Sequence, residues 1–335
     1  MSRITCCGNK TLFIDDKNDI WCEAINASYF KPERRIPSGI YAKKEEFSSI
    51  LQIAGVCVLE GHAVFLRDDG LVFGTGCNEF AQLSGGDAAP LQGSHPVYGL
   101  SNIISIATAD THTLAIDDSY SVWGVGLNLG QLGTAGSIKI FSPVKLEGIP
   151  QILAVCAGKR HSLFLDFDGK VWYCGSSELG RFVLGVKDES WAKPRILPFE
   201  NRIVQMSSHG VEAMFLDCTG NVFLASTSGM MKLQLTFTPK QVSSGNYNFI
   251  LDVEGKLWQV TSGLSVVEIE GLPPLEEIFY VVIGLVGCAE DDQLWDIWMR
   301  KQNGKEELKL FPKTVPFTLL PQNNDKNIKS ARKVQ

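Results

Sequence analysis

The sequence predicts an all-β protein, a seven-bladed β-propeller, because one unit recurs along the chain and each copy contains the turn chemistry of a β-hairpin. Three copies align without gaps from His62, His112 and His161, and the clearest reads HTLAIDDSYSVWGVGLNLGQLG. Weaker copies begin at Thr11, Met214, Asn248 and Val286. Each copy has an aromatic residue at one equivalent position, and these residues are Trp21, Phe73, Trp123, Trp172, Phe223, Trp258 and Trp295. Self-similarity of this kind is the signature of a repeat architecture.

The spacing of the aromatic residues fits one propeller blade for each copy. Successive spacings are 52, 50, 49, 51, 35 and 37 residues. A single blade cannot cover both of its faces, so seven blades arranged around an axis would bury their apolar surfaces against their neighbours. The two short spacings leave open whether the copies there form complete four-stranded blades.

Each copy also contains the pattern of a hairpin. In the copy that starts at His161, the apolar run 163–165 is followed by the turn pair Asp168-Gly169 and by a second β-rich run, 171–173. Glycine suits such a turn because it adopts positive φ without steric cost. A further β run, such as residues 152–157, precedes the hairpin. Short strands at regular spacing, with hardly any helical periodicity, indicate an all-β array.

The glycines of residues 123–133, WGVGLNLGQLG, are interpreted as architectural, although such a stretch could be taken for a phosphate-binding loop. Related glycines recur about one repeat away, in FGTGCNEFAQLSGG and YCGSSELG. A dinucleotide fingerprint should occur once, between a strand and a long helix, with an acidic residue about 20 positions further on. No helical pattern follows Gly133, and we expect no nucleotide or other cofactor.

Composition places the chain among globular proteins, with 335 residues of which 44% are hydrophobic and 20% charged. The formal charge of −6 argues against a broad nucleic-acid-binding surface, which needs clustered Lys and Arg. Nine scattered cysteines without a CxxC pair indicate reduced thiols, and therefore an intracellular protein of the cytoplasm or nucleus. The longest apolar run, residues 278–289, is too short to span a bilayer, so we expect no membrane insertion. We also expect a monomer.

The repeat unit resembles that of the regulator of chromosome condensation family. The shared pattern is H-[ST]-x-x-L-x-x-D-G-x-V-W-x-x-G-x-N-x-x-G-Q-L-G, clearest from His112 to Gly133. The resemblance is strong across residues 50–185 and degraded from 186 to 300. Kelch repeats would need a Gly-Gly doublet in every blade, and Gly85-Gly86 occurs once. The WD40 signatures do not recur together in any blade.

The resemblance implies a seven-bladed propeller that is closed by pairing of N- and C-terminal strands in one blade. Residues 307–320, ELKLFPKTVPFTLL, would complete the sheet begun by residues 4–21. Such closure removes exposed sheet edges. We therefore expect a single propeller over residues 1–320 and a short polar, disordered tail over residues 321–335.

The equivalent histidines His62, His112 and His161 are predicted to be structural. On a propeller they would lie in separate blades and could not converge on one metal, so we expect them to bond the turn before each hairpin and expect no metal site. No Ser/His/Asp set can be nominated, since Ser162 alternates away from its neighbour His161 on a strand. Paired acids such as Asp117-Asp118 recur at the hairpin turns and are interpreted as turn residues. We expect no catalytic residue.

The residues just before each of these histidines are the predicted partner-binding positions. They are Glu60-Gly61, Asp110-Thr111 and Lys159-Arg160, and they differ from copy to copy within a constant frame. Rigid scaffolds commonly present such variable loops for binding. Trp191 lies outside the repeated aromatic position in a polar loop, and either anchors an interface or packs on a neighbouring loop. The largely basic segment 31–47 either docks an acidic partner or is a solvated insertion.

The function predicted from these features is a non-enzymatic protein–protein interaction platform. The alternative is a guanine-nucleotide exchange factor or regulator of a small GTPase of the Ran, Rab or Rho type. The resemblance implies it, because in the family's namesake acidic residues of these loops face the GTPase Ran, and Asp110 matches one such position. Two departures stand against it: Lys159-Arg160 occupies the next acidic position, and no wedge-like insertion follows Asp110.

Overall fold

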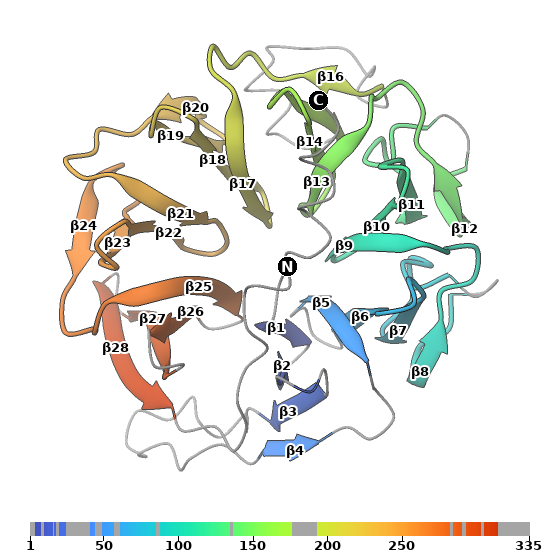
Figure 1. Cartoon of the computed structure of the whole chain (residues 1–335), viewed down its shortest axis with the longest axis horizontal. Coiled ribbons are helices and arrows are strands. Elements are labelled where there is room, and N and C mark those ends of the chain that lie inside the picture. The colour runs from blue at the N-terminus through green and yellow to red at the C-terminus, as the bar shows by residue number, and fades with distance from the viewer. Residues whose placement is uncertain are drawn as a thin grey trace.

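The fold is a β-propeller, as Figure 1 shows in the computed structural model viewed down its shortest axis. The structure describes residues 4–7, 10–15, 17, 20–24, 41–43, 49–56, 61–84, 88–134, 137–175, 193–281, 284–289, 293–302 and 305–313. Within these ranges every helix or strand element is a strand, and the strands form seven four-stranded sheets. The all-β propeller predicted from the sequence is therefore confirmed.

Each sheet is antiparallel and uses four consecutive strands, the first of which lies nearest the centre in Figure 1. The sheets are numbered in chain order. Sheet 1 contains β1 (Ile4–Cys7), β2 (Lys10–Ile14), β3 (Ile20–Ala24) and β4 (Tyr41–Lys43). Sheet 2 contains β5 (Ile50–Val56), β6 (His62–Arg67), β7 (Val72–Gly76) and β8 (Leu91–Pro96). Sheet 3 contains β9 (Ile103–Ala109), β10 (His112–Asp117), β11 (Val122–Leu127) and β12 (Lys139–Lys145).

The remaining four sheets follow the same plan. Sheet 4 contains β13 (Ile152–Ala157), β14 (His161–Asp166), β15 (Val171–Gly175) and β16 (Arg195–Ile196). Sheet 5 contains β17 (Ile203–His209), β18 (Glu212–Asp217), β19 (Val222–Ser226) and β20 (Gly229–Lys232). Sheet 6 contains β21 (Pro239–Ser243), β22 (Asn248–Asp252), β23 (Leu257–Val260) and β24 (Val266–Ile269). Sheet 7 contains β25 (Leu275–Val281), β26 (Gly284–Ala289), β27 (Leu294–Gln302) and β28 (Lys305–Lys313).

The short repeats form complete sheets, which the sequence left open. The spacings of 35 and 37 residues fall across sheets 5 to 7, and each of these sheets has four strands. They are short in sequence because the third and fourth strands are joined by few residues. In sheet 5 this connection is residues 227–228, whereas residues 128–138 make it in sheet 3. The fourth strand is thus kept and only its loop is reduced.

The core lies between the sheets. Seven hydrophobic clusters each join two neighbouring sheets, and the cluster between sheets 3 and 4 combines Leu114 and Val122 with Ile152 and Phe164. The second strands are buried on both faces: β14 is buried along its whole length. Burying one such Phe or Leu side chain contributes about 1.5–3 kcal/mol. Each sheet therefore depends on both neighbours for its stability.

The predicted closure by pairing of terminal strands is not confirmed within the described residues. β28, within the segment expected to complete the first sheet, pairs with β27, and β1 pairs with β2. Sheets 1 and 7 meet instead through side chains, since Ile4 and Phe13 pack with Phe279 and Val286. Among the described strands, the fourth strand of sheet 1 is β4, which pairs with β3. The predicted tail, residues 321–335, and the domain end at residue 320 lie outside the described residues.

Candidate functional site

The repeated histidines join neighbouring sheets near the start of each second strand. His62 Nε2 lies 2.7 Å from Thr108 Oγ1, His112 Nε2 2.9 Å from Ser162 Oγ, and His161 Nε2 2.8 Å from Ser208 Oγ. Each hydroxyl belongs to the following sheet, whereas the sequence had predicted a bond to the turn before the hairpin. We call these three the inter-sheet histidines.

Burial keeps the inter-sheet histidines neutral. It lowers the pKa of His62 and of His161 to about 4, and that of His112 to about 3. The three rings are at most 2% exposed. A neutral ring that bonds one hydroxyl group is a structural element and a poor candidate for acid–base chemistry near neutral pH.

Glutamine side chains make a second set of inter-sheet links at the innermost strands. Gln241 Nε2 donates to the Ile278 carbonyl oxygen at 2.8 Å, and the Ile278 amide donates back to Gln241 Oε1 at 2.9 Å. Gln52 makes the same two bonds with Ile106, at 2.9 and 3.0 Å. The Val242 amide donates to Gln205 Oε1 at 2.8 Å. An amide group that satisfies both backbone positions acts as an added rung between two sheets.

The hairpin acids are turn residues, as predicted. Asp166 Oδ1 accepts bonds from the backbone amides of Asp168 and Lys170, at 3.0 and 2.8 Å, and Oδ2 accepts the Trp172 indole N–H at 2.9 Å. The same carboxylate-to-indole bond joins Asp15 to Trp21, Asp117 to Trp123 and Asp252 to Trp258. The repeated tryptophan therefore anchors the turn of its own hairpin.

In hairpins that lack either the Asp or the Trp of this pair, the residues at the two positions make other interactions. In sheet 2 the acid is replaced by Arg67, whose guanidinium carbon lies 5.1 Å from the centroid of the Phe73 ring. In sheet 5 Phe223 has no N–H; burial raises the pKa of Asp217, but bonds from Asn221, Asn201 and Thr219 lower it to about 2.

Sheet 7 keeps the tryptophan but lacks its acceptor. Ala289 occupies the position of the acid, since its amide donates to the Gln293 carbonyl oxygen as the Asp166 amide donates to that of Lys170. The buried Nε1 of Trp295 has no hydrogen-bond partner among the described residues.

The loops before the histidines form one hydrogen-bonded row across sheets 3 to 5. Gln131 Nε2 donates to Thr111 Oγ1 at 3.4 Å, and Thr111 Oγ1 donates to the Lys159 carbonyl oxygen at 3.5 Å. The Lys159 amide donates to the Gly210 carbonyl oxygen at 2.7 Å. Thr111, Lys159 and Gly210 lie in loops that join the first and second strands of sheets 3 to 5, whereas Gln131 lies between the third and fourth strands of sheet 3. We call the surface formed by the loops between first and second strands the pre-histidine face.

The predicted contact residues of this row are Asp110, Lys159 and Arg160. Lys159 and Arg160 are exposed, and Asp110 is half-buried. Burial raises the pKa of the Asp110 carboxyl group, and the positive charge of Lys159 opposes that shift. The structure thus brings an acid of sheet 3 within electrostatic reach of a base of sheet 4. Glu60, Trp191 and the segment 31–47 (except 41–43) lie outside the described residues.

The glycines of residues 123–133 are architectural, as predicted. A Cβ atom on Gly126 would run into the carbonyl oxygen of Thr111, and Gly126 has φ of +118°. A Cβ atom on Gly124 would approach Leu132 Cδ2 to 2.7 Å. Positive φ and close approach both select glycine here. No helix follows in the described residues, so the context of a dinucleotide site is missing.

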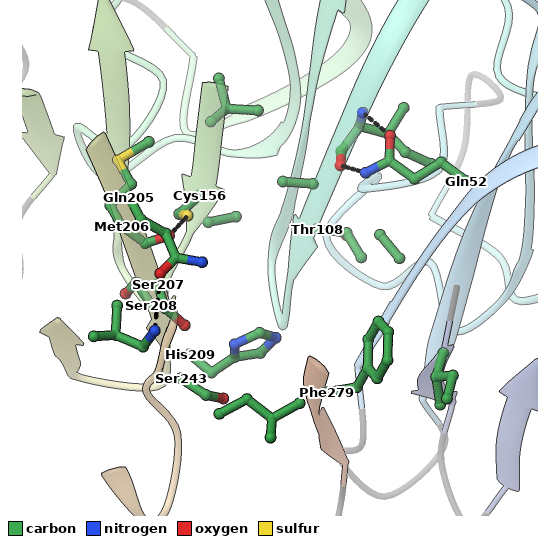
Figure 2. A pocket seen from close by; sticks show the side chains of 18 of the residues that line it. Gln52, Thr108, Cys156, Gln205, Met206, Ser207, Ser208, His209, Ser243 and Phe279 are labelled. Atoms are coloured by element: carbon green, nitrogen blue, oxygen red, sulfur yellow. Dashed lines mark hydrogen bonds between the residues drawn. The ribbon is translucent and has the colours of Figure 1, made fainter. Parts of the chain in front are cut away.

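A cavity of about 390 Å³ lies on the propeller axis and is lined by the innermost strands. Figure 2 shows its polar wall, including Gln52, Gln205, Cys156 and His209. The glutamines are engaged in inter-sheet bonds, and Cys156 Sγ donates to the Met206 carbonyl oxygen at 3.5 Å. Burial raises the pKa of Cys156 to about 12 and lowers that of His209 to about 4. Neither group is poised as a nucleophile or base.

Within the described residues there is no group of three or more His, Cys, Asp or Glu side chains that could hold a metal ion. The same part of the chain has no helix of the length and apolar character required to cross a bilayer.

Known proteins share the repeat and the fold. Residues 152–181 match the model of the regulator of chromosome condensation (RCC1) repeat. Protein RCC2 of Homo sapiens is 30% identical over 116 residues, which cover 33% of this chain and 22% of that protein. The crystal structure of human WBSCR16 is similar with a TM-score of 0.69 and 17% identity, over 86% of this chain and 87% of that one.

A second solved structure is that of Prp20p from Saccharomyces cerevisiae, which was described together with its binding properties to Gsp1p and histones. Its TM-score is 0.61 at 16% identity, over 80% of this chain and 76% of that one. At this identity the two structures show the common fold. The chain spans 22–23% of the length of the RCC2 proteins that it matches.

Proposed function

We propose that this chain, an RCC1-like β-propeller, acts as a non-enzymatic platform that binds other proteins through its pre-histidine face. The observation that carries the proposal is the hydrogen-bonded row of loops across sheets 3 to 5. The row fixes the backbone, while its outward side chains change from acid to base between neighbouring sheets. A rigid frame with variable charges is suited to selective recognition, because little conformational entropy is lost on binding.

Affinity capture tests this proposal. The full chain, immobilised, is exposed to extract of its native cell, and retained proteins are quantified by mass spectrometry. The triple variant Asp110→Asn, Lys159→Glu, Arg160→Glu is compared with wild type and with Lys170→Glu, which changes an exposed charge at the opposite ends of the strands. Partners that bind the pre-histidine face are lost from the triple variant and kept by the Lys170 variant. Equal retention by all three proteins would refute the proposal.

Exchange activity toward a small GTPase is the second candidate, and Asp110 favours it. Its half-buried carboxyl group stands where an acidic contact is expected from the family resemblance, and the solved relative is described with binding to Gsp1p. The residues before His161 are basic, which opposes a purely acidic contact surface. Release of fluorescent GDP from Ran, Rab and Rho proteins measures the activity. Acceleration that disappears in Asp110→Ala supports exchange, and stable binding without release supports the platform.

The setting of this function is also a proposal. We infer a monomer located in the cytoplasm or nucleus, without nucleic acid or membrane as the direct partner. Support comes from five cysteines of the described residues, all of which are free thiols. Sedimentation velocity of the purified chain determines the oligomeric state, and imaging of the tagged protein determines the compartment.

A further inference from the structure

The opposite ends of the same strands carry a second surface with different chemistry. At these ends the second and third strands are joined by tight hairpins, and we call this the hairpin-turn face. In six sheets the innermost strand has a register shift there that leaves its second residue without a partner on the neighbouring strand. A bulge of this kind redirects a side chain away from the sheet.

The bulged residues are apolar in four consecutive sheets. They are Leu51, Ile104, Leu153 and Val204 in sheets 2 to 5, followed by Lys240 and Glu276 in sheets 6 and 7. Leu153 is 45% exposed and Val204 is 54% exposed. The innermost strands β9, β13 and β17 contact one another in order, so the bulged residues of sheets 3 to 5 occupy equivalent neighbouring positions.

Two aromatic residues extend this apolar row outward along the hairpins of sheets 3 and 4. Tyr120 stands where Gly169 and the other hairpin glycines occur, and it has φ of +61°. Its ring lies edge-on to Phe167 of the next sheet, with centroids 4.8 Å apart, and Phe167 is 40% exposed. A bulky residue in the left-handed region costs about 1–2 kcal/mol, and such strain persists where the surroundings hold it or function needs it.

We propose that Ile104, Tyr120, Leu153, Phe167 and Val204, here named the apolar crescent, dock a basic amphipathic segment of a partner protein. Leu153, Phe167 and Val204 are its exposed members, whereas Ile104 and Tyr120 are half-buried and also pack on the core between sheets 3 and 4.

The positive charge expected of the partner follows from the charges around the crescent. The two hairpin turns and two linkers that frame it are residues 117–121, 146–151, 166–170 and 197–202. Besides the two turn-bound acids Asp117 and Asp166, they contain four exposed carboxylates and two exposed basic side chains. One of the basic side chains, Arg202, donates to the carbonyl oxygens of Phe167 and Asp168. At the other ends of the same sheets, residues 110–111 and 158–160 contain one carboxylate and two basic side chains.

Exposed acidic side chains lie next to the apolar residues of the crescent. Asp118 adjoins the turn of Tyr120, and Asp168 adjoins Phe167, both exposed. A segment that presents leucine-like side chains toward Leu153 and Val204 and lysines toward these acids would bury apolar surface while pairing its charges at the rim. This surface is independent of the pre-histidine face, so the failure of either proposal leaves the other standing.

Binding of three synthetic peptides tests the proposal. They are an 18-residue amphipathic helix of Leu and Lys, the same helix with Glu in place of Lys, and a Leu/Lys peptide of scrambled order. Fluorescence anisotropy measures Kd for the full chain. The amphipathic Leu/Lys peptide binds at least tenfold more tightly than the other two, and a photo-crosslinker on it labels residues of the hairpin-turn face.

Variants on the two faces supply the matched control. Leu153→Ser with Val204→Ser weakens binding of the Leu/Lys helix about tenfold or more, because the contacting apolar area is lost. Val211→Ser truncates a side chain that is also 45% exposed but lies on the pre-histidine face, and it leaves Kd unchanged. Asp118→Asn with Asp168→Asn weakens binding severalfold and reduces its salt dependence. Thermal melting confirms that all variants are folded.

Several outcomes overturn the proposal. Equal affinity for the Lys and Glu helices would show that the partner's positive charge does not contribute to binding. Equal loss of binding in the Val211 variant would show that the peptide does not bind at the crescent. If sedimentation velocity shows a dimer that Leu153→Ser with Val204→Ser dissociates, the crescent is an interface between copies of this chain.

Discussion

The bond between Asp166 and the Trp172 indole N–H provides a quantitative test of how each hairpin is stabilised. The substitution Asp166→Ala removes the carboxylate that accepts three hydrogen bonds, one from the indole N–H and two from backbone amides. Hydrogen bonds to charged groups contribute about 1.5–3 kcal/mol each. The two amides belong to exposed turn residues and regain water, whereas the half-buried indole does not fully do so. We therefore expect a loss of about 3 kcal/mol in the free energy of unfolding.

A double-mutant cycle isolates the indole bond. Trp172→Phe is a conservative partner change, because phenylalanine occupies the equivalent position at Phe73 and Phe223. In the Trp172→Phe background, Asp166→Ala should cost less by about 1.5 kcal/mol or more, which is the coupling energy of the pair. Urea unfolding followed by circular dichroism measures the four free energies. A coupling energy below about 0.5 kcal/mol would show that the indole contributes only by packing.

Three further predictions follow from the same structure. The inter-sheet histidines have folded-state pKa values below the unfolded value of about 6.5. Their contribution to stability is therefore complete above pH 6.5 and declines as the pH falls toward 4. At pH 5 each of these histidines lowers the free energy of unfolding by about 2 kcal/mol relative to neutral pH. Urea midpoints at pH 7 and pH 5 measure this, and His161→Asn should have a smaller difference between them; an unchanged difference would contradict the assignment. Gln241→Ala, which removes both bonds to the neighbouring backbone, should destabilise the protein by about 2–3 kcal/mol, while the adjacent exposed Lys240→Ala should be neutral in the same assay. Gly126→Ala should cost about 3 kcal/mol or more because of its carbonyl clash, whereas Gly148→Ala, also at positive φ but with open space around its Cβ position, should cost about 1 kcal/mol; similar melting temperatures for the two would refute the clash.

Most of the fold could be predicted from the repeat, because the sequence patterns of the repeat are local. The aromatic residue and the hairpin turn lie within a dozen residues of each other, and their periodic return requires equivalent sheets around an axis. The outer strands escaped prediction because segments such as Lys139–Lys145 alternate between half-buried and exposed positions without an apolar run. Closure was predicted from resemblance alone, and the resemblance did not reveal that Tyr41–Lys43 forms a fourth strand of sheet 1.

The site was less predictable, because its links cross between repeats. The spacing of six residues between Asp117 and Trp123, repeated at Asp166 and Trp172, is visible in the sequence and would have indicated the carboxylate-to-indole bond. The inter-sheet histidine bonds join groups 46 to 50 residues apart, and no local pattern pairs a histidine with a hydroxyl at that distance. The bulged residues are set by register, which a one-dimensional pattern does not specify.

The order of the described strands has a consequence for how the ring is assembled. Each sheet is made from one continuous stretch of chain, so the first can form while later ones are still being synthesised. The last junction to form is then the one between sheets 1 and 7, where Ile4 and Phe13 pack with Phe279 and Leu294. This junction joins two sheets that are not consecutive in the chain, so we expect it to open first under force or heat.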